Sequence, residues 1–217
     1  MGNKRDDFIY PPNMWIYKHV LDRFPIGHAG YAIDVGASDG FSLNTTYMLE
    51  KMYGWNVLSV EANPTYRAVL NEQRARVEMC ACASEPCESA VFHVHVENPE
   101  AFSSLCPTTR NELYQEDMDR SGDSQISWES IEVPVRTLDQ LIARWEFPRL
   151  DLLCVDTEGT ELDVLKGLDI KKWMPKVIVT ECWDLEGPID PYLESFGYTK
   201  TERQYDYARN DIFVIVE

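Results

Sequence analysis

Basic residues are scarce in this chain of 217 residues. Lys and Arg together number 20, against 37 Asp and Glu, so the formal net charge is −17. Proteins that bind DNA or RNA normally neutralise phosphates with Lys and Arg, and this sequence has no run rich in either. An anionic membrane surface would need the same residues. We therefore expect neither nucleic acid nor a membrane as a partner.

Long apolar runs and an export signal are also missing. No stretch approaches the roughly 18 apolar residues that a transmembrane helix needs. The charged residues 1–7 lead to Tyr10-Pro11-Pro12 with no apolar signal-peptide core between them. The six cysteines lack the paired Cys-x2-Cys knuckles of a zinc ribbon, and Cys154 and Cys182 lie within apolar runs, where reduced cysteine behaves as a small hydrophobic residue. These absences predict a cytoplasmic protein with reduced thiols.

Short apolar runs alternate with amphipathic segments, which is typical of an α/β domain with a parallel sheet. Two strands expected near 197–200 and 212–216 have no helix between them, which predicts an antiparallel hairpin at the end of the sheet. We expect a single domain over residues 1–217, with a helical extension at 1–29. The apolar runs predict core strands at 31–35, 56–61, 77–83, 150–156 and 176–181.

Residues 97–130 differ from the rest because they are polar, acidic and weakly periodic. A segment this long without regular structure is unusual inside a compact domain, and such segments often serve as lids or binding loops. We interpret it as a lid or substrate-binding insert. The alternative is a disordered surface excursion without a function.

Acidic residues mark the ends of four predicted strands. Asp34, Glu61, Asp156 and Glu181 stand at or near these ends. In an open α/β sheet, ligands bind beyond the carboxyl ends of the strands. A single acid at such an end is usually only solvated, but four of them beside one glycine turn predict a binding site at this edge.

A glycine-bracketed turn, Asp34-x-Gly36-x-x-x-Gly40, follows the first strand. Glycine permits positive φ and lets the backbone approach a ligand closely. The turn lacks the G-x-G-x-x-G spacing of dinucleotide sites, and Phe41 stands where a P-loop has Lys. It therefore favours an amino-acid-like ligand, with Asp34 near the ammonium group. Glu61, 21 residues after Gly40, can accept hydrogen bonds from both ribose hydroxyls of an adenosine ligand, and the glycine spacing favours S-adenosylmethionine (SAM) over NAD.

The sequence resembles the FkbM-type SAM-dependent methyltransferases in two sets of blocks. The first half carries Ala32-Ile33-Asp34-Val35-Gly36-Ala37-Ser38-Asp39-Gly40, Ser42-Leu43-Asn44-Thr45 and Val60-Glu61-Ala62-Asn63-Pro64. The second half carries Val135-Arg136-Thr137-Leu138-Asp139, Leu152-Leu153-Cys154-Val155-Asp156-Thr157-Glu158-Gly159-Thr160-Glu161 and Val177-Ile178-Val179-Thr180-Glu181. The resemblance spans about residues 30–181 and implies a Rossmann-like, seven-stranded class I methyltransferase fold with a mostly parallel sheet.

The resemblance also implies an activity and a cofactor site. The activity would be transfer of a methyl group from SAM to a hydroxyl of a sugar, a glycan or another small molecule. By motif position, the methionine end of SAM would contact Asp34, Gly36, Ala37, Ser38 and Gly40. Glu61 would hold the ribose. Near the adenine would lie Ala62, Ala83 and Ser84, and the cofactor site would also include Asn44, Ser104 and Asp156.

An aliphatic hydroxyl is a poor nucleophile, so a base or a metal should help to remove its proton. The candidates are Asp156, Glu158 and Glu181, with Glu158 as the favoured base. Oxygen ligands suit Mg²⁺ or another hard divalent cation, for which we select Asp156 and Glu181. The alternative for Glu158 is an acid that the helix macrodipole favours in a first turn.

Two other functions stay open at this stage. One is methylation of an amino group, although the Asp/Asn-Pro-Pro-Tyr motif of DNA amino-methyltransferases is absent. The other is a non-catalytic SAM-fold module for binding or assembly, against which the intact glycine turn and strand-end acids argue. The sequence leaves open the identity of the acceptor, the need for a metal and whether the chain forms a homo-oligomer.

Overall fold

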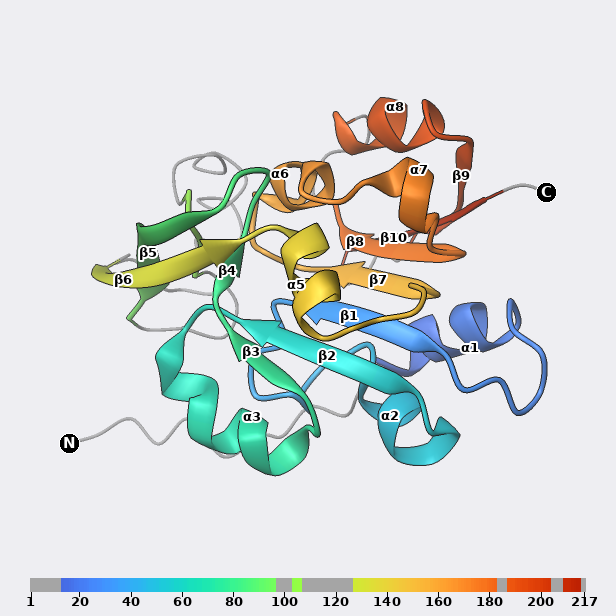
Figure 1. Ribbon diagram of the computed structural model, residues 1–217, viewed down its shortest axis with the longest axis horizontal. Helices are drawn as coiled ribbons and strands as arrows, with labels where there is room; N and C mark the ends of the chain where they lie inside the picture. Colours follow the sequence, from blue (N-terminus) through green and yellow to red (C-terminus); the bar gives the residue numbers. More distant parts are fainter. Residues whose placement is uncertain (1–12, 97–102, 107–126, 183–186, 204–208, 216–217) are drawn as a thin grey trace, which may run out of the picture.

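A seven-stranded sheet forms the centre of the computed structural model, which describes residues 13–96, 103–106, 127–182, 187–203 and 209–215 (Figure 1). Its strands lie in the order β3-β2-β1-β7-β8-β10-β9. They are β1 (Tyr31–Val35), β2 (Asn56–Glu61), β3 (Val77–Met79), β7 (Leu152–Val155), β8 (Val177–Glu181), β9 (Tyr198–Arg203) and β10 (Asn210–Ile215). β3, β2, β1, β7 and β8 are parallel, whereas β10 pairs antiparallel with β8 and β9. The predicted fold, including its C-terminal hairpin, is confirmed.

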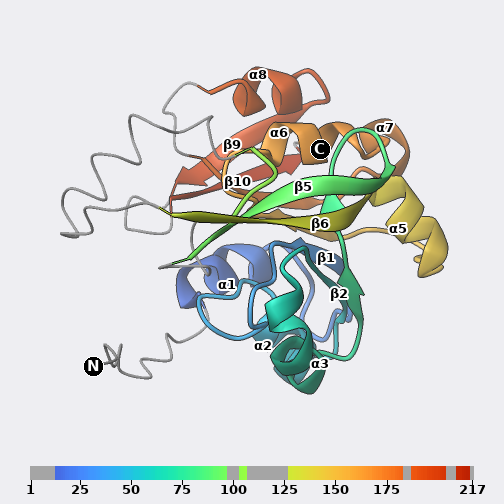
Figure 2. The same cartoon turned by 90° about the vertical axis from the view of Figure 1, so that its left-hand side faces the viewer.

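Helices cover both faces of this sheet (Figure 2). On one face lie α1 (Met14–Leu21), α2 (Tyr47–Tyr53) and α3 (Arg67–Gln73), which the 3-10 helix η1 (Pro64–Tyr66) precedes. On the other lie α5 (Leu138–Arg144), α6 (Glu161–Lys166), α7 (Ile170–Trp173) and α8 (Ile189–Glu194). The helix expected within residues 1–29 is α1, and residues 1–12 lie outside the described part. Among the described residues, no helix has the length and apolar character to cross a membrane.

The central strands are buried on both faces, as their near-continuous apolar runs predict. In β1, Ile33 and Val35 belong to the core beneath α5, α6 and α8, whereas Ala32 belongs to the core beneath α1 and α2. Leu152 and Leu153 of β7 are fully buried in these two cores, one in each. Because successive side chains alternate between faces, the register of each strand decides which residues reach the site.

A second sheet of three strands lies beside the carboxyl ends of β1 and β2 (Figure 1). Its strands, in the order β4-β6-β5, are β4 (Ala81–Cys82), β5 (Cys87–His95) and β6 (Trp128–Arg136). The sequence predicted one strand over 77–83, but the chain changes sheets at Cys80. Cys80 packs in the core of the main sheet, whereas Ala81 packs with Phe92 and Val133 of the second sheet. One apolar run therefore serves two cores, which the sequence pattern does not separate.

The predicted insert 97–130 lies largely outside the described residues. Its positions 103–106 are described, and Ser104 pairs through two backbone hydrogen bonds with His93 of β5 (2.9 and 3.0 Å). Trp128 begins β6, so regular structure resumes before residue 131, where we expected it. The role of the insert as a lid or substrate-binding segment stays a prediction.

Gly167 follows α6 and brings this helix against the second sheet. Its φ of −77° suits any residue, but a Cβ there would lie 2.4 Å from the carbonyl oxygen of Ala83. We expect Gly167→Ala to destabilise the protein by about 2 kcal/mol, because a backbone segment must move to make room. Urea unfolding monitored by circular dichroism measures the change.

The sign of that change tests the contact. If Gly167 did not lie against the carbonyl oxygen of Ala83, Gly167→Ala would stabilise the protein by roughly 0.4–1 kcal/mol, because alanine restricts the unfolded chain. Gly197→Ala serves as the control, since its Cβ would meet nothing within 4 Å. The positive φ of Gly197, 89°, by itself predicts a loss of about 1 kcal/mol there.

Candidate functional site

Three of the four predicted strand-end acids stand at one edge of the main sheet, whereas Asp34 lies within β1. The parallel register pairs Val35 of β1 with Val60 of β2 and with Val155 of β7, and β8 continues the same register beside β7. The residues that follow on β1, β2, β7 and β8 therefore stand at one level, and they are Gly36, Glu61, Asp156 and Glu181. Because side chains alternate between the faces of a sheet, these three acids project toward the face that α1 and α2 cover.

The glycine loop after β1 contacts two neighbouring segments at glycine positions. A Cβ on Gly36 would lie 1.7 Å from the carbonyl oxygen of Asp156, and the φ of Gly36 is +85°. Gly40 has φ +79°, and a Cβ there would lie 2.7 Å from the Leu70 side chain and 2.8 Å from that of Arg74. Both positions therefore require glycine for backbone conformation and for close packing.

Glu61 connects the end of β2 to this loop. It is buried, and its two carboxylate oxygens accept hydrogen bonds from the backbone N–H groups of Ser38 (2.8 Å) and Asn63 (2.7 Å). Burial raises the pKa of Glu61 above its ordinary value, and these N–H groups act in the opposite direction by stabilising the carboxylate. Glu61, which we predicted to bind the ribose, thus lies in direct contact with the loop that we predicted to bind the methionine end.

Asp34 and Asn44 meet in a buried network beneath the loop. Oδ2 of Asp34 accepts hydrogen bonds from Nδ2 of Asn44 (2.9 Å) and from the hydroxyl of Thr46 (2.6 Å). Nη1 of Arg74 lies 3.8 Å from the same oxygen. The structure therefore places Asp34 among groups that hold the loop, and its contact with an ammonium group stays a prediction.

The segment between β7 and α6 folds around a carboxylate that the sequence analysis missed. Oε1 of Glu161 accepts hydrogen bonds from the backbone N–H groups of Thr157 (3.1 Å) and Gly159 (2.9 Å). Glu158, the predicted base, has φ +56°, a conformation that is uncommon for a residue with a side chain. Such backbone strain concentrates at functional sites. Because Glu161 binds the N–H groups on both sides of Glu158, it fixes the turn that carries this residue.

Three carboxylates converge beside this turn. One oxygen each from Asp156, Glu161 and Glu181 lies within 4.8 Å of the other two. Asp156 is exposed, whereas Glu161 and Glu181 are buried. Hard oxygen donors at this spacing fit a divalent cation such as Mg²⁺, which would offset the repulsion between the carboxylates. Glu161 thus joins Asp156 and Glu181, the two candidate ligands that we selected from the sequence.

The second sheet contributes the remaining predicted residues. The Ser104 side chain is buried, and its hydroxyl donates to the carbonyl oxygen of Thr157 (3.2 Å) next to Asp156. Ala62 and Ala83 pack against the apolar core of the second sheet. Ser84 follows β4, and its hydroxyl donates to Oδ1 of Asp163 on α6 (2.6 Å).

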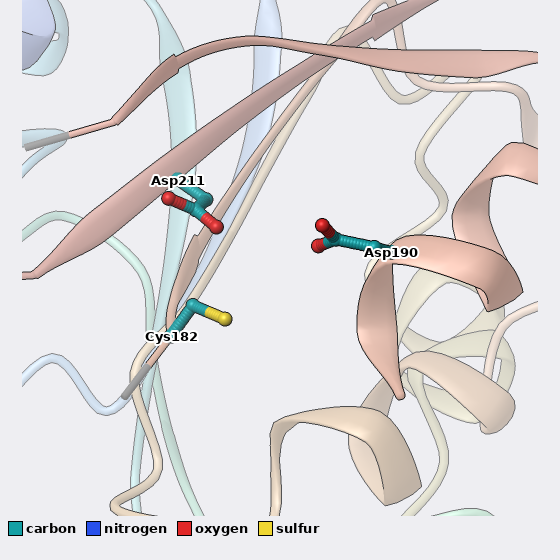
Figure 3. Close-up of side chains that lie close together, drawn as sticks. All are labelled: Cys182, Asp190 and Asp211. Carbon is teal, nitrogen blue, oxygen red and sulfur yellow. The ribbon is translucent and has the colours of Figure 1, made fainter. Parts of the chain in front are cut away.

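A second cluster of potential metal ligands lies at the same edge, between β8, β10 and α8. Figure 3 shows the Cys182 thiol and the Asp190 and Asp211 carboxylates turned toward one another. Lys200 contacts both carboxylates, and Nε of Arg203 donates to Asp211 (2.6 Å), so two cations already balance the two anions. Burial raises the pKa of Cys182 to about 12, which disfavours the thiolate that binds metals. We interpret this cluster as an ion-pair network that fastens α8, β9 and β10 beside Glu181.

Two residues that organise the candidate site had no clear signal in the sequence. Arg74 ends an amphipathic helix, a position where arginine is usually a surface charge. Glu161 lies in the first turn of α6, where acids are common because they interact favourably with the helix dipole. Only the contacts with segments distant in the sequence distinguish Arg74 from an ordinary helix-terminal arginine.

Comparisons with known proteins identify the family of the chain. A family model for the methyltransferase FkbM domain matches residues 34–200. Methyltransferase sdnD of Sordaria araneosa is 27% identical over 231 residues, which cover 93% of this chain and 88% of that protein. Methyltransferase 1 of Beauveria bassiana (strain ARSEF 2860) is 25% identical over 206 residues, which cover 88% of this chain and 81% of that protein.

A crystal structure shares the fold. Methyltransferase FkbM from Methylobacillus flagellatus KT matches with a TM-score of 0.57 and 16% identity over 95% of this chain. The match covers 48% of that protein, so the present chain spans about half its length. The family match includes the glycine loop, the strand-end acids and most of the main sheet. The chain therefore belongs to the FkbM family of SAM-dependent methyltransferases.

Proposed function

We propose that this protein is an O-methyltransferase that transfers the methyl group of SAM to a hydroxyl of a sugar, a glycan or another small molecule. The observation that carries the proposal is the convergence of Asp156, Glu161 and Glu181 beside the glycine loop. Because Gly36 touches the backbone of Asp156, the loop that would hold the methyl donor adjoins the acids that would act on the acceptor.

The cofactor would lie along the carboxyl edge from β1 to the second sheet. Its methionine end would contact the loop through Gly36, Ala37, Ser38 and Gly40, above the network of Asp34 and Asn44. Glu61 would accept hydrogen bonds from the ribose, which its place at the end of β2 supports. Ala62, Ala83 and Ser84 would lie near the adenine, and Ser104 and Asp156 would close the site from the side of the second sheet.

The chemistry would require alignment and removal of one proton. SAM supplies an activated methyl group, and the protein would hold the acceptor oxygen in line with it. Glu158, whose backbone conformation is held by Glu161, would accept the proton of the hydroxyl. The ligands of Mg²⁺ or another divalent cation would be Asp156, Glu161 and Glu181. Such a cation would lower the pKa of the acceptor hydroxyl.

The cofactor assignment predicts the binding of the product S-adenosylhomocysteine. We expect the wild-type protein to bind it in a calorimetric titration and to give no heat with NAD. Glu61→Ala should weaken binding at least about tenfold, because hydrogen bonds to a charged group contribute roughly 1.5–3 kcal/mol each. Glu194→Ala, an exposed acid on α8, is the control and should bind like the wild type. Equal affinity of the Glu61→Ala variant would contradict the ribose assignment.

The base and metal assignments predict the rates of turnover on hydroxyl acceptors. A panel of sugars, amino sugars and small molecules with hydroxyl or amino groups is screened with radiolabelled SAM, and NMR of the product identifies the methylated atom. Glu158→Gln should lower kcat about 100-fold or more, which is typical for loss of a general base. Glu194→Gln should keep the full rate. A methylated amine as the sole product would replace the O-methyltransferase proposal, and cofactor binding with no turnover on any acceptor would support a non-catalytic module.

Removal of divalent cations tests the carboxylate cluster separately. We expect EDTA treatment to lower the rate and added Mg²⁺ to restore it, whereas the Asp156→Asn variant should not recover. Equilibrium dialysis with Mn²⁺ as the probe measures cation binding directly. An EDTA-treated enzyme that keeps its full rate would exclude the cation from the reaction and leave Glu158 as the base.

A further inference from the structure

We infer that Arg74 is the positioning residue of the cofactor loop, and that it sets affinity for the amino-acid end of SAM. The inference rests on the proposed function, because it takes the glycine loop as the site of that end. Arg74 directly follows α3, and its side chain has no exposed surface. A fully buried arginine is rare unless its charge and its donors are all engaged.

The guanidinium group of Arg74 contacts three points of the segment from Gly40 to Thr46. Nη1 donates to the carbonyl oxygen of Gly40 (3.2 Å) and to Oδ1 of Asn44 (3.0 Å). Nη2 donates to the hydroxyl of Thr46 (2.7 Å). The aliphatic part of the same side chain packs against Gly40, where a Cβ would lie 2.8 Å from Cγ of Arg74. One side chain therefore fixes the path of the segment by both hydrogen bonds and packing.

The charge of Arg74 is balanced by carboxylates from two other elements. Its Nε donates to Oε2 of Glu50 on α2 (2.6 Å), and its Nη1 lies 3.8 Å from Oδ2 of Asp34 on β1. Glu50 also accepts a hydrogen bond from the backbone N–H of Ala75 (3.0 Å). Lysine cannot replace this arrangement, because an ammonium group is a single point charge without the planar fork of donors.

These contacts join the loop to α2, α3 and β1 through groups of the protein alone. A loop that is held in one conformation binds more tightly, since less ordering is needed on binding. The adenosine part of SAM is proposed to contact Glu61 and the segments beyond it. Loss of Arg74 should therefore weaken contacts with the amino-acid end more than contacts with adenosine. A general loss of structure would weaken both.

The experiment compares two ligands that differ in the amino-acid end. S-Adenosylhomocysteine carries it, whereas 5′-methylthioadenosine lacks it. We expect Arg74→Lys to weaken binding of the first at least about tenfold and of the second less than about twofold, as measured by calorimetry. Arg67→Lys, at an exposed arginine of α3, is the matched control and should change neither affinity. Circular dichroism at the titration temperature shows which variants are folded.

Glu50→Gln provides the same test if Arg74→Lys does not fold. This substitution removes the charge and replaces one of the two carboxylate oxygens that accept from Arg74 and Ala75 with an NH2 group, which cannot accept. It should weaken binding of S-adenosylhomocysteine by about threefold and leave binding of 5′-methylthioadenosine unchanged. Equal binding of S-adenosylhomocysteine by the wild type and the folded variants would overturn the role of Arg74 while the proposed function stands. An equal loss for both ligands would also overturn it. A wild-type protein that binds neither ligand would overturn the proposed function and this inference together.

Discussion

The backbone contact between Gly36 and Asp156 is the constraint on which the site depends. Gly36 begins the loop after β1, and Asp156 begins the segment after β7. The strands β1 and β7 are neighbours in the sheet but distant in the sequence. The N–H of Asp156 donates to the carbonyl oxygen of Val35 (2.9 Å), so the strand pairing continues to this level. Any side chain at position 36 would push apart the two segments, which are the glycine loop and the turn that carries Glu158.

The protein buries several carboxylates, and it stabilises them in different ways. Asp34 and Glu50 share the guanidinium group of Arg74, and Asp211 lies between Lys200 and Arg203. Removal of one partner from such a network is costly because the other charge stays buried. Glu61 and Glu161 instead accept backbone N–H groups at the ends of β2 and β7, which also orders the turns around them. The ion-paired carboxylates therefore join neighbouring elements of the fold, whereas those bound to N–H groups shape the turns at the carboxyl edge of the sheet.

Local patterns were enough to predict the main sheet, because buried parallel strands have continuous apolar runs. Turn residues mark the ends of these strands, so the glycine loop and the edge at which Glu61, Asp156 and Glu181 stand were also predictable. The break at Cys80 was not predictable, since the residues on both sides of it are apolar but pack in different cores. Arg74 and Glu161 were missed for a different reason. Arg74 depends on partners brought close by the fold, such as Asn44, which is 30 residues away in the sequence. Glu161 binds local N–H groups, but only the fold brings it close to Glu181 of β8.

The second sheet and the acidic turn are fastened to each other at three points. Gly167 at the end of α6 touches Ala83, Asp163 of α6 binds Ser84, and the Ser104 hydroxyl donates to Thr157. In each of these contacts one partner, Gly167, Asp163 or Thr157, belongs to the segment that runs from β7 through α6 to Gly167. This segment also carries Asp156, Glu158 and Glu161. A shift of the second sheet would therefore move the segment that carries Asp156, Glu158 and Glu161, whereas Glu181 belongs to β8 of the main sheet. The glycine loop is supported from the other side by Arg74, and the Gly36–Asp156 contact is where these two supports meet.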